Sequence, residues 1–174
     1  MQAFDMFGSK KNVENEVEVL QSKTLMEEVV KNLHLYAPLY IEGRVIHQSA
    51  YVLSPIVIEA KYPDSIPSVN EVHFKFNNRL GKVEIHDTSY PVNQWENTSY
   101  GMLRFVPNPY FHPSNNLAKE KSNDYYFSLI PAKKTADQIL GQLNIVPSSK
   151  QSTVIDLSIQ GEVPKRGADI LNEL

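Results

Sequence analysis

Two short alternating stretches, residues 72–76 and 83–86, most constrain what this chain can fold into. In each of them apolar residues occupy every second position, which is the pattern of a strand with one buried face. Residues 77–82 between them contain the asparagine and glycine that turns prefer. The sequence therefore predicts an antiparallel hairpin here.

One register makes both halves of this hairpin consistent. Its pairs are Phe76 with Val83, Lys75 with Glu84, Phe74 with Ile85, and His73 with His86. This register buries the apolar side chains on one face and places opposite charges side by side on the other.

Further strand patterns occur along the chain, and three stretches have helical periodicity. Strands are predicted at residues 56–61, 100–106, 125–130, 143–146 and 153–159. Helices are predicted at residues 12–35, 131–141 and from Pro164 onward. Residues 91–99, around the single tryptophan, are polar and are expected to form a loop. The fold class expected is α+β, with a mixed, mainly antiparallel sheet of five or more strands and two or three helices packed on it.

The first predicted helix is amphipathic, with apolar residues recurring on one face and acidic or basic residues on the rest. Asn12 is a plausible N-cap, and Pro38 limits the helix at its other end. At the other end of the chain, Pro164 occupies a first-turn position, and no capping residue closes the helix that it begins. We expect that helix to continue beyond Leu174.

Length and charge limit the function classes. The chain has 174 residues, which favours one domain, and its 17 Lys and Arg are interspersed with 20 Asp and Glu. No basic stripe favours nucleic acid, and no polybasic run favours an anionic membrane surface. Cysteine is absent, which excludes disulfides and thiolate metal sites. No apolar run approaches the roughly 20 residues that a membrane span needs.

Motifs for catalysis are not found. Gly81 and Lys82 are followed by Val83, so they do not form a phosphate-binding loop, and no Gly-x-Ser-x-Gly elbow occurs. His73 and His86 could hold a metal with Asp87 or His47, but a solvated polar face is the simpler interpretation. No catalytic residue, cofactor or metal site is therefore assigned.

Several aromatic residues gather around the stretches expected to be loops. Trp95, Tyr100 and Tyr110 are candidate sugar-contact residues, because aromatic rings stack on sugar rings. Packing of these rings in the core is the favoured alternative.

Residues 13–35, VENEVEVLQSKTLMEEVVKNLHL, resemble the first periplasmic helix of the polysaccharide co-polymerases, or chain-length determinant proteins. That family's pattern is roughly Asn-Glu-Ile-Glu-Ile-Leu-Lys-Ser-Arg-x-Leu-x-x-x-Val-Val. Residues 152–159 and 164–172 resemble its second hallmark, a strand leading through Pro-x-x-Ala-x-x-Ile-x-Asn into a long helix. The stretches at 100–109 and 143–150 are also similar to Bacteroidetes-type members.

The resemblance implies that residues 1–174 are a single periplasmic domain, truncated at the start of its long C-terminal helix. It implies a parent anchored in the bacterial inner membrane by two transmembrane helices outside these residues, with or without a cytoplasmic tyrosine kinase domain. Its expected role is non-catalytic: self-association into a ring that controls the length and export of capsular polysaccharide or exopolysaccharide. The expected partners are a polymerase, an outer-membrane export protein and the nascent polysaccharide.

Two alternatives stay open. A stand-alone carbohydrate-binding module is suggested by the loop aromatics, whereas a hydrolase would need a nucleophile or a carboxylate pair that the sequence does not reveal.

Overall fold

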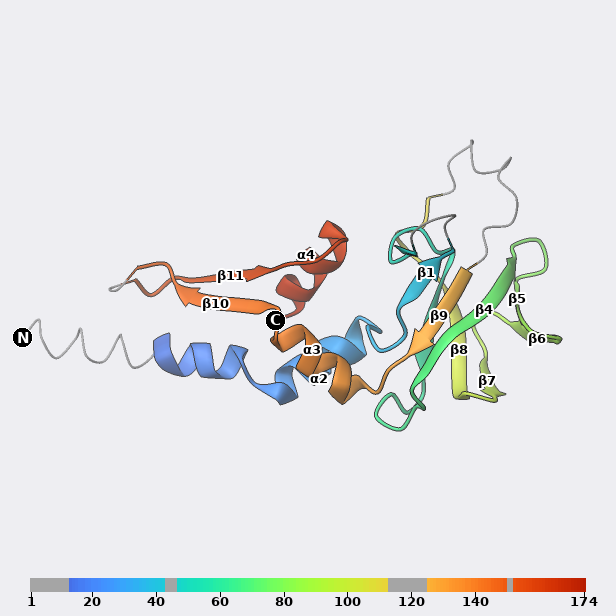
Figure 1. The fold of residues 1–174 in the computed structure, drawn as a ribbon, viewed down its shortest axis with the longest axis horizontal. Helices are drawn as coiled ribbons and strands as arrows, with labels where there is room; N and C mark the ends of the chain where they lie inside the picture. The colour runs from blue at the N-terminus through green and yellow to red at the C-terminus, as the bar shows by residue number, and fades with distance from the viewer. Residues whose placement is uncertain (1–12, 43–46, 113–124, 150–151) are drawn as a thin grey trace, which may run out of the picture. The chain divides into compact units, whose positions relative to one another are not determined.

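The structure is a computed structural model that describes residues 13–42, 47–112, 125–149 and 152–174. The chain divides into two compact units (Figure 1). We call His34–Ala132 the central unit, and Met1–Leu33 together with Lys133–Leu174 the terminal unit. The expectation of a single domain over residues 1–174 stays a prediction.

The central unit contains a six-stranded antiparallel sheet. Its strands, in spatial order, are β2 (Gln48–Ser49), β1 (Leu39–Ile41), β9 (Tyr125–Leu129), β4 (Val69–Asn77), β5 (Lys82–Ile85) and β6 (Thr88–Pro91). Strand β9 is buried along its whole length, because it lies between β1 and β4 in the middle of the sheet.

A second, three-stranded antiparallel sheet belongs to the same unit. It consists of β3 (Ile56–Ala60), β8 (Gly101–Pro107) and β7 (Trp95–Thr98), in that spatial order. Burial alternates along β3 and β8, so each has one inner, buried face and one outer face. The inner face carries Ile56, Ile58, Leu103 and Phe105, which are fully buried.

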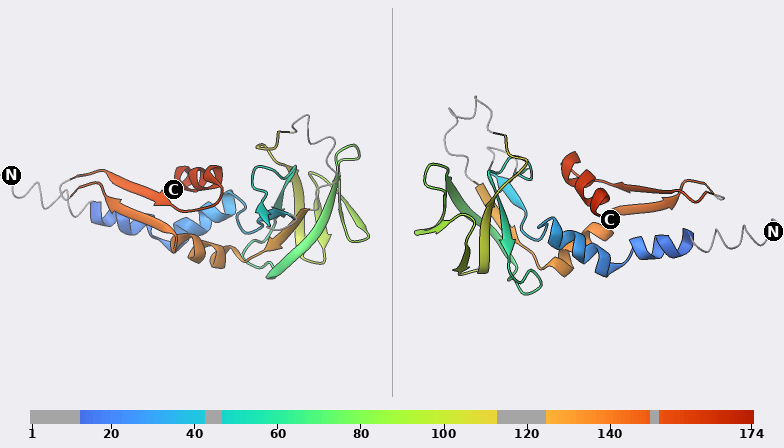
Figure 2. Two further views of the ribbon diagram at one scale, coloured as in Figure 1. Left: turned by 45° about the horizontal axis from the view of Figure 1, so that its top comes forward. Right: turned by 180° about the vertical axis from the view of Figure 1, so that it is seen from behind.

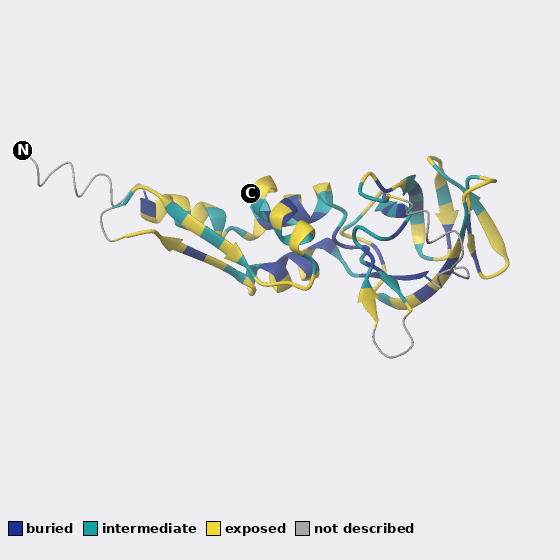
Figure 3. Ribbon diagram, turned by 90° about the horizontal axis from the view of Figure 1, so that it is seen from above, coloured by how far each residue is buried: buried dark blue, intermediate teal, exposed yellow. Residues whose placement is uncertain are grey.

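Aromatic rings connect the two sheets of the central unit. Between ring centroids, Phe105 on β8 lies 5.8 Å from Tyr90 on β6, and Phe127 on β9 lies 6.0 Å from Tyr100, which directly precedes β8. The core of the central unit therefore lies between the inner face of the three-stranded sheet and the six-stranded sheet (Figure 3).

The predicted hairpin of residues 72–86 is confirmed in its first two pairs, Phe76 with Val83 and Lys75 with Glu84. Strand β5 then ends at Ile85, and His86 adopts a left-handed backbone conformation (φ 52°) that turns the chain into β6. The ladder of β4 with β5 therefore stops before the expected pairs of Phe74 with Ile85 and of His73 with His86. His73 instead pairs with Tyr126 of β9 on the other side.

The prediction of a loop over residues 91–99 is wrong for its second half. Trp95–Thr98 is strand β7, which pairs with β8 from Trp95 opposite Arg104 to Thr98 opposite Gly101. A short polar stretch such as this has no clear alternation, so its strand conformation comes from the hydrogen bonds offered by the edge of β8.

The terminal unit contains helical residues 13–20, the hairpin of β10 and β11, and the remaining helices. The labelled elements are α2 (Lys23–Asn32), α3 (Ala132–Leu140), β10 (Leu143–Pro147), β11 (Ile155–Ile159) and α4 (Pro164–Glu173). Figure 2 shows β10 and β11 as one two-stranded ribbon. Its pairing places Leu143 opposite Ile159 and Ile145 opposite Leu157, so one face of the ribbon is apolar.

The single helix predicted over residues 12–35 is wrong in its continuity. The helix is interrupted at Gln21 and Ser22, and Ser22 then acts as the N-cap of α2 by accepting a hydrogen bond from the backbone N–H of Leu25 at 3.3 Å. A serine hydroxyl competes with helical hydrogen bonding inside a helix and is favoured at its start. The predicted cap Asn12 lies outside the described residues.

Helix α4 approaches β11 closely. A Cβ atom at Gly167 would lie 3.3 Å from Cγ2 of Ile159, which is tighter than most such contacts. Glycine at this position therefore lets the helix pack directly on the strand.

The α+β fold class is confirmed. The described residues contain four helical segments, because the first predicted helix is two, together with antiparallel sheets that include one of six strands. Over the same ranges, no helix is both long enough and apolar enough to cross a membrane.

Candidate functional site

A row of side chains crosses the outer face of the three-stranded sheet. Glu59 on β3 and Trp95 on β7 are both register partners of Arg104 on β8. Because directly opposed residues of antiparallel strands point to the same face, these three side chains lie side by side. We call Glu59, Arg104 and Trp95 the outer row.

Arg104 contacts both of its neighbours in the outer row. Its Nε donates to Oε2 of Glu59 at 2.5 Å, and its Nη2 forms an ion pair with the same oxygen. Its guanidinium carbon lies 4.8 Å from the centroid of the Trp95 ring, in cation–π geometry. The side chain of Glu59 is 15% exposed, that of Arg104 is 36% exposed, and Trp95 is 41% exposed. The row therefore becomes more accessible from Glu59 toward Trp95.

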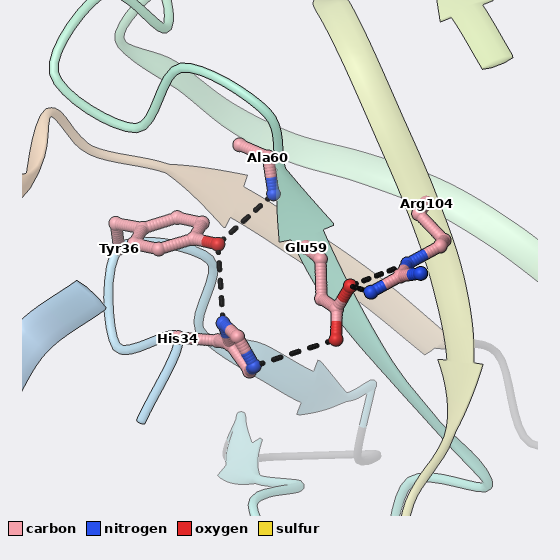
Figure 4. A network of polar contacts seen from close by, with 5 residues as sticks. All are labelled: His34, Tyr36, Glu59, Ala60 and Arg104. Carbon is pink, nitrogen blue, oxygen red and sulfur yellow. Dashed lines mark hydrogen bonds and ion pairs between the residues drawn. The ribbon is translucent and has the colours of Figure 1, made fainter. Parts of the chain in front are cut away.

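His34 and Tyr36 extend this network beyond Glu59 (Figure 4). Nε2 of His34 lies 3.6 Å from Oε1 of Glu59, and its Nδ1 lies 3.2 Å from the hydroxyl oxygen of Tyr36. The same hydroxyl oxygen accepts a hydrogen bond from the backbone N–H of Ala60 at 2.9 Å. The polar contacts thus run without a break from Tyr36 through His34 and Glu59 to Arg104.

Burial controls the charge state of Tyr36. Loss of solvent raises the pKa of Tyr36 to about 12, and the negative charge of Glu59 adds to this effect, while the hydrogen bond from Ala60 opposes it. The phenol therefore keeps its proton. The phenol oxygen can accept from Ala60 and still share a hydrogen bond with Nδ1 of His34, because a hydroxyl group has one donor and two acceptor positions.

His34 has a left-handed backbone conformation (φ 53°) directly after the C-cap of α2 at Leu33. This conformation costs a residue with a Cβ atom about 1–2 kcal/mol, and glycine or asparagine usually occupies it. The contacts of the imidazole with Tyr36 and Glu59 offset that cost, as does the hydrogen bond from the backbone N–H of Ala37 to the carbonyl of His34 at 3.1 Å.

A second cluster surrounds Tyr126 on the six-stranded sheet. Its ring stacks on Tyr40 at 5.0 Å, and the rings of His47 and His73 lie 5.4 and 5.6 Å away. His73 also lies 3.7 Å from a carboxylate oxygen of Glu42. Burial, Tyr40 and nearby carboxylates raise the pKa of Tyr126. Because the Tyr126 ring is almost fully covered, this cluster offers edges and imidazoles rather than an open aromatic face.

A hollow of about 350 Å³ lies beside this cluster. It is lined by Glu71, His73, Phe74, Lys75, Glu84, His86 and Tyr125. His73 and His86 therefore share a hollow, but His47 and Asp87, the further metal ligands considered above, do not line it. Across the described ranges, no group of three or more His, Cys, Asp or Glu side chains has a metal-binding arrangement.

The three candidate sugar-contact aromatics do not form one platform. Trp95 lies in the outer row, Tyr100 packs edge-on against Phe127, and Tyr110 packs against Tyr51 at 5.8 Å. Tyr100 precedes β8 and Tyr110 follows it, so a strand about 20 Å long separates them. Of the three, Trp95 is the exposed ring.

Sequence patterns missed the partners of Trp95. The alternation in residues 56–61 and 100–106 predicts which face each side chain occupies, but the Glu59–Arg104 pair joins residues 45 positions apart. No local signal specifies that pairing. His34 and Tyr36 were likewise overlooked, because they fall at the end of a predicted helix.

A scan against protein-family models finds no match for this sequence, and no curated protein matches it either. The resemblance to polysaccharide co-polymerases therefore rests on the residues that carry it, at 13–35 and 152–172.

Proposed function

We propose that this chain is a non-catalytic assembly module of a polysaccharide co-polymerase, which controls the chain length and export of capsular polysaccharide or exopolysaccharide. In this proposal the module lies on the periplasmic side of the bacterial inner membrane. It self-associates into a ring within the full-length protein and works with a polymerase and an outer-membrane export protein.

One observation carries the proposal. The two stretches that resemble the family lie at opposite ends of the sequence, yet residues 13–33 of the first and all of the second belong to the terminal unit. Asn32 of α2 donates through Nδ2 to Oε1 of Glu173 on α4 at 2.8 Å, across 141 positions of sequence. Contact between the two helices that carry the resemblance supports the interpretation that they belong to one structural element of the family and are not two chance similarities.

The local structure of the second stretch adds support. Residues 155–159 form strand β11, and Pro164 begins α4 at its first turn. This is the strand, proline and helix order on which the resemblance was based.

The test of this function is the length of the polymer. Deletion of the gene is expected to replace a polysaccharide of defined modal length with one of broad or altered distribution on a gel, and the wild-type gene should restore the mode. An unchanged length distribution in the deletion strain would refute the proposal.

Self-association can be tested with the same strain. Residues 1–174 contain no cysteine, so Val19→Cys adds a single thiol to this module, on helical residues 13–20, where Val19 is 57% exposed. A thiol cross-linker applied to membranes is expected to give dimers of the full-length Val19→Cys protein that the wild-type protein does not give. A purely monomeric pattern would argue against a ring whose subunits meet at this helix.

The alternative, a stand-alone carbohydrate-binding module, is favoured by the exposed ring of Trp95 beside a fixed guanidinium. Calorimetry with capsular oligosaccharides separates the two functions. A module that acts alone should bind them without the rest of the parent protein, and Trp95→Ala should abolish the heat of binding.

A further inference from the structure

We propose that the outer face of the three-stranded sheet binds an acidic saccharide, one whose sugar units carry carboxylates, through Trp95, Arg104 and Lys61. The inference rests on the proposed function, because it names the chemical class of polymer that such a module would contact.

A second row of side chains lies beside the outer row. Asn97 on β7 is the register partner of Met102 on β8, and the backbone N–H of Lys61 donates to the carbonyl of Met102 at 3.0 Å. Strand alternation places Lys61, Met102 and Asn97 on the same face as Glu59, Arg104 and Trp95, about 7 Å further along the strands. The face therefore presents two cations, Arg104 and Lys61, in neighbouring rows.

Arg104 keeps a donor for a ligand. Glu59 takes Nε and Nη2 of the guanidinium, and Nη1 has no hydrogen-bond partner in the described part of the chain. The pairing with Glu59 fixes the plane of the guanidinium. The position of Nη1 is therefore set before a ligand binds. A donor that is already fixed in this way loses less conformational entropy on binding a carboxylate than a flexible ammonium does.

Lys61 supplies the second cation. It is exposed, and its Nζ lies 5.9 Å from the centroid of the Tyr62 ring. Within the described ranges no carboxylate lies at ion-pair distance from Lys61. An anion of the ligand would meet a charge that is not already neutralised.

Trp95 supplies the apolar contact. Its indole lies at the accessible end of the outer row, and Tyr62, next to Lys61, is 62% exposed. The apolar face of a sugar ring removes such aromatic surface from water when it stacks on it.

The charge of this face favours an acidic saccharide over a neutral one. Of the ionisable groups in the two rows, Arg104 and Lys61 are positive and Glu59 is negative, so the face has a net positive charge on a chain whose net charge is −3. A neutral saccharide would use only the ring and the hydrogen-bond donors. An acidic one would also be attracted by the cations.

The test uses the single tryptophan as its reporter, since Trp95 is the only indole of the chain. A galacturonate hexamer added to the 174-residue chain is expected to change the Trp95 emission saturably. The fully methyl-esterified hexamer, which has the same rings without the charges, should bind at least fivefold more weakly. Equal binding of the two hexamers, or no saturable change with either, overturns the proposal.

Matched variants test the residues. Lys61→Gln is expected to weaken binding of the charged hexamer by up to about fivefold, the effect of losing one exposed charge pair. Lys133→Gln removes the same charge from an exposed position on α3 in the terminal unit and should leave binding unchanged. Calorimetry of Trp95→Leu should show loss of binding. Equal weakening by Lys61→Gln and Lys133→Gln would show that binding depends only on the net charge of the chain, and would refute the site.

Failure of this inference and failure of the proposed function give different results. If the hexamer does not bind but deletion of the gene alters polymer length, the function stands and this face is not its saccharide site. If the hexamer binds through Lys61 but polymer length is unaffected by deletion, the site stands and the assembly role does not.

Discussion

Arg104 on β8 donates through Nε to Oε2 of Glu59 on β3 at 2.5 Å, and the two residues are direct register partners. Glu59 is the less exposed of the two, with a second contact to His34 at 3.6 Å. The guanidinium is therefore the group that balances a carboxylate largely removed from water, and it also contacts the ring of Trp95.

Replacing Arg104 by Met should destabilise the protein, because it leaves the Glu59 carboxylate without its main partner. We expect a loss of about 1–3 kcal/mol in the free energy of unfolding by urea. Adding Glu59→Gln to Arg104→Met should recover part of the loss. Strictly additive effects in this double-mutant cycle would show that the two side chains do not interact.

Tyr36 should make stability fall at high pH. The pKa of Tyr36 is about 12 in the folded protein against an ordinary value of 10.0, so its contribution is complete below pH 10 and is lost as pH rises through 12. The total change is about 3 kcal/mol. Urea unfolding between pH 9 and 12 should show this decline in the wild type and a shallower one in Tyr36→Phe.

At neutral pH, Tyr36→Phe should also cost about 1–3 kcal/mol, because the buried N–H of Ala60 loses its acceptor. A variant as stable as the wild type at pH 7 would contradict the network shown in Figure 4.

Ser22→Ala should destabilise α2 by about 1 kcal/mol, because the backbone N–H of Leu25 loses its side-chain acceptor. Ser22→Asp retains an acceptor at the positive end of the helix dipole and should be close to wild type. The free energies of unfolding of the two variants, measured side by side, provide the check, and equal losses would exclude a capping role.

Gly167→Val should destabilise the terminal unit by about 1–3 kcal/mol, because its side chain would overlap Cγ2 of Ile159 on β11. Ile159→Ala in the same chain should relieve the overlap, so that the double variant loses less than the sum of the single losses. Gly167→Leu provides a second variant with a bulky side chain at the same position. Additive losses would indicate that α4 does not pack on β11 at this point.

Much of the fold could be predicted from local patterns. The alternation in residues 56–61, 72–76 and 83–86 gave strands whose buried and exposed faces the structure confirms. Pro131 and Pro164 marked the starts of α3 and α4 within one residue. These features are local, because side-chain periodicity and the fixed φ of proline act within a few residues.

The candidate site was predicted only in part. Its chemistry marks Trp95 as a candidate, but the sequence predicts a loop there and does not separate Trp95 from Tyr100 and Tyr110, which pack elsewhere. The helix break at Ser22 was also missed, although a capping serine is a local signal. In that case the continuous apolar stripe of residues 13–35 outweighed it.

The sequence by itself determined the strands with clear alternation, the face that each of them buries, and the starts of α3 and α4. Only the tertiary structure decided that Trp95 lies on a strand, that Arg104 stands between it and Glu59, and that Asn32 meets Glu173. The physical reason is that periodicity is set by neighbours along the chain, whereas the choice of partner depends on hydrogen bonds and burial between residues 45 and 141 positions apart.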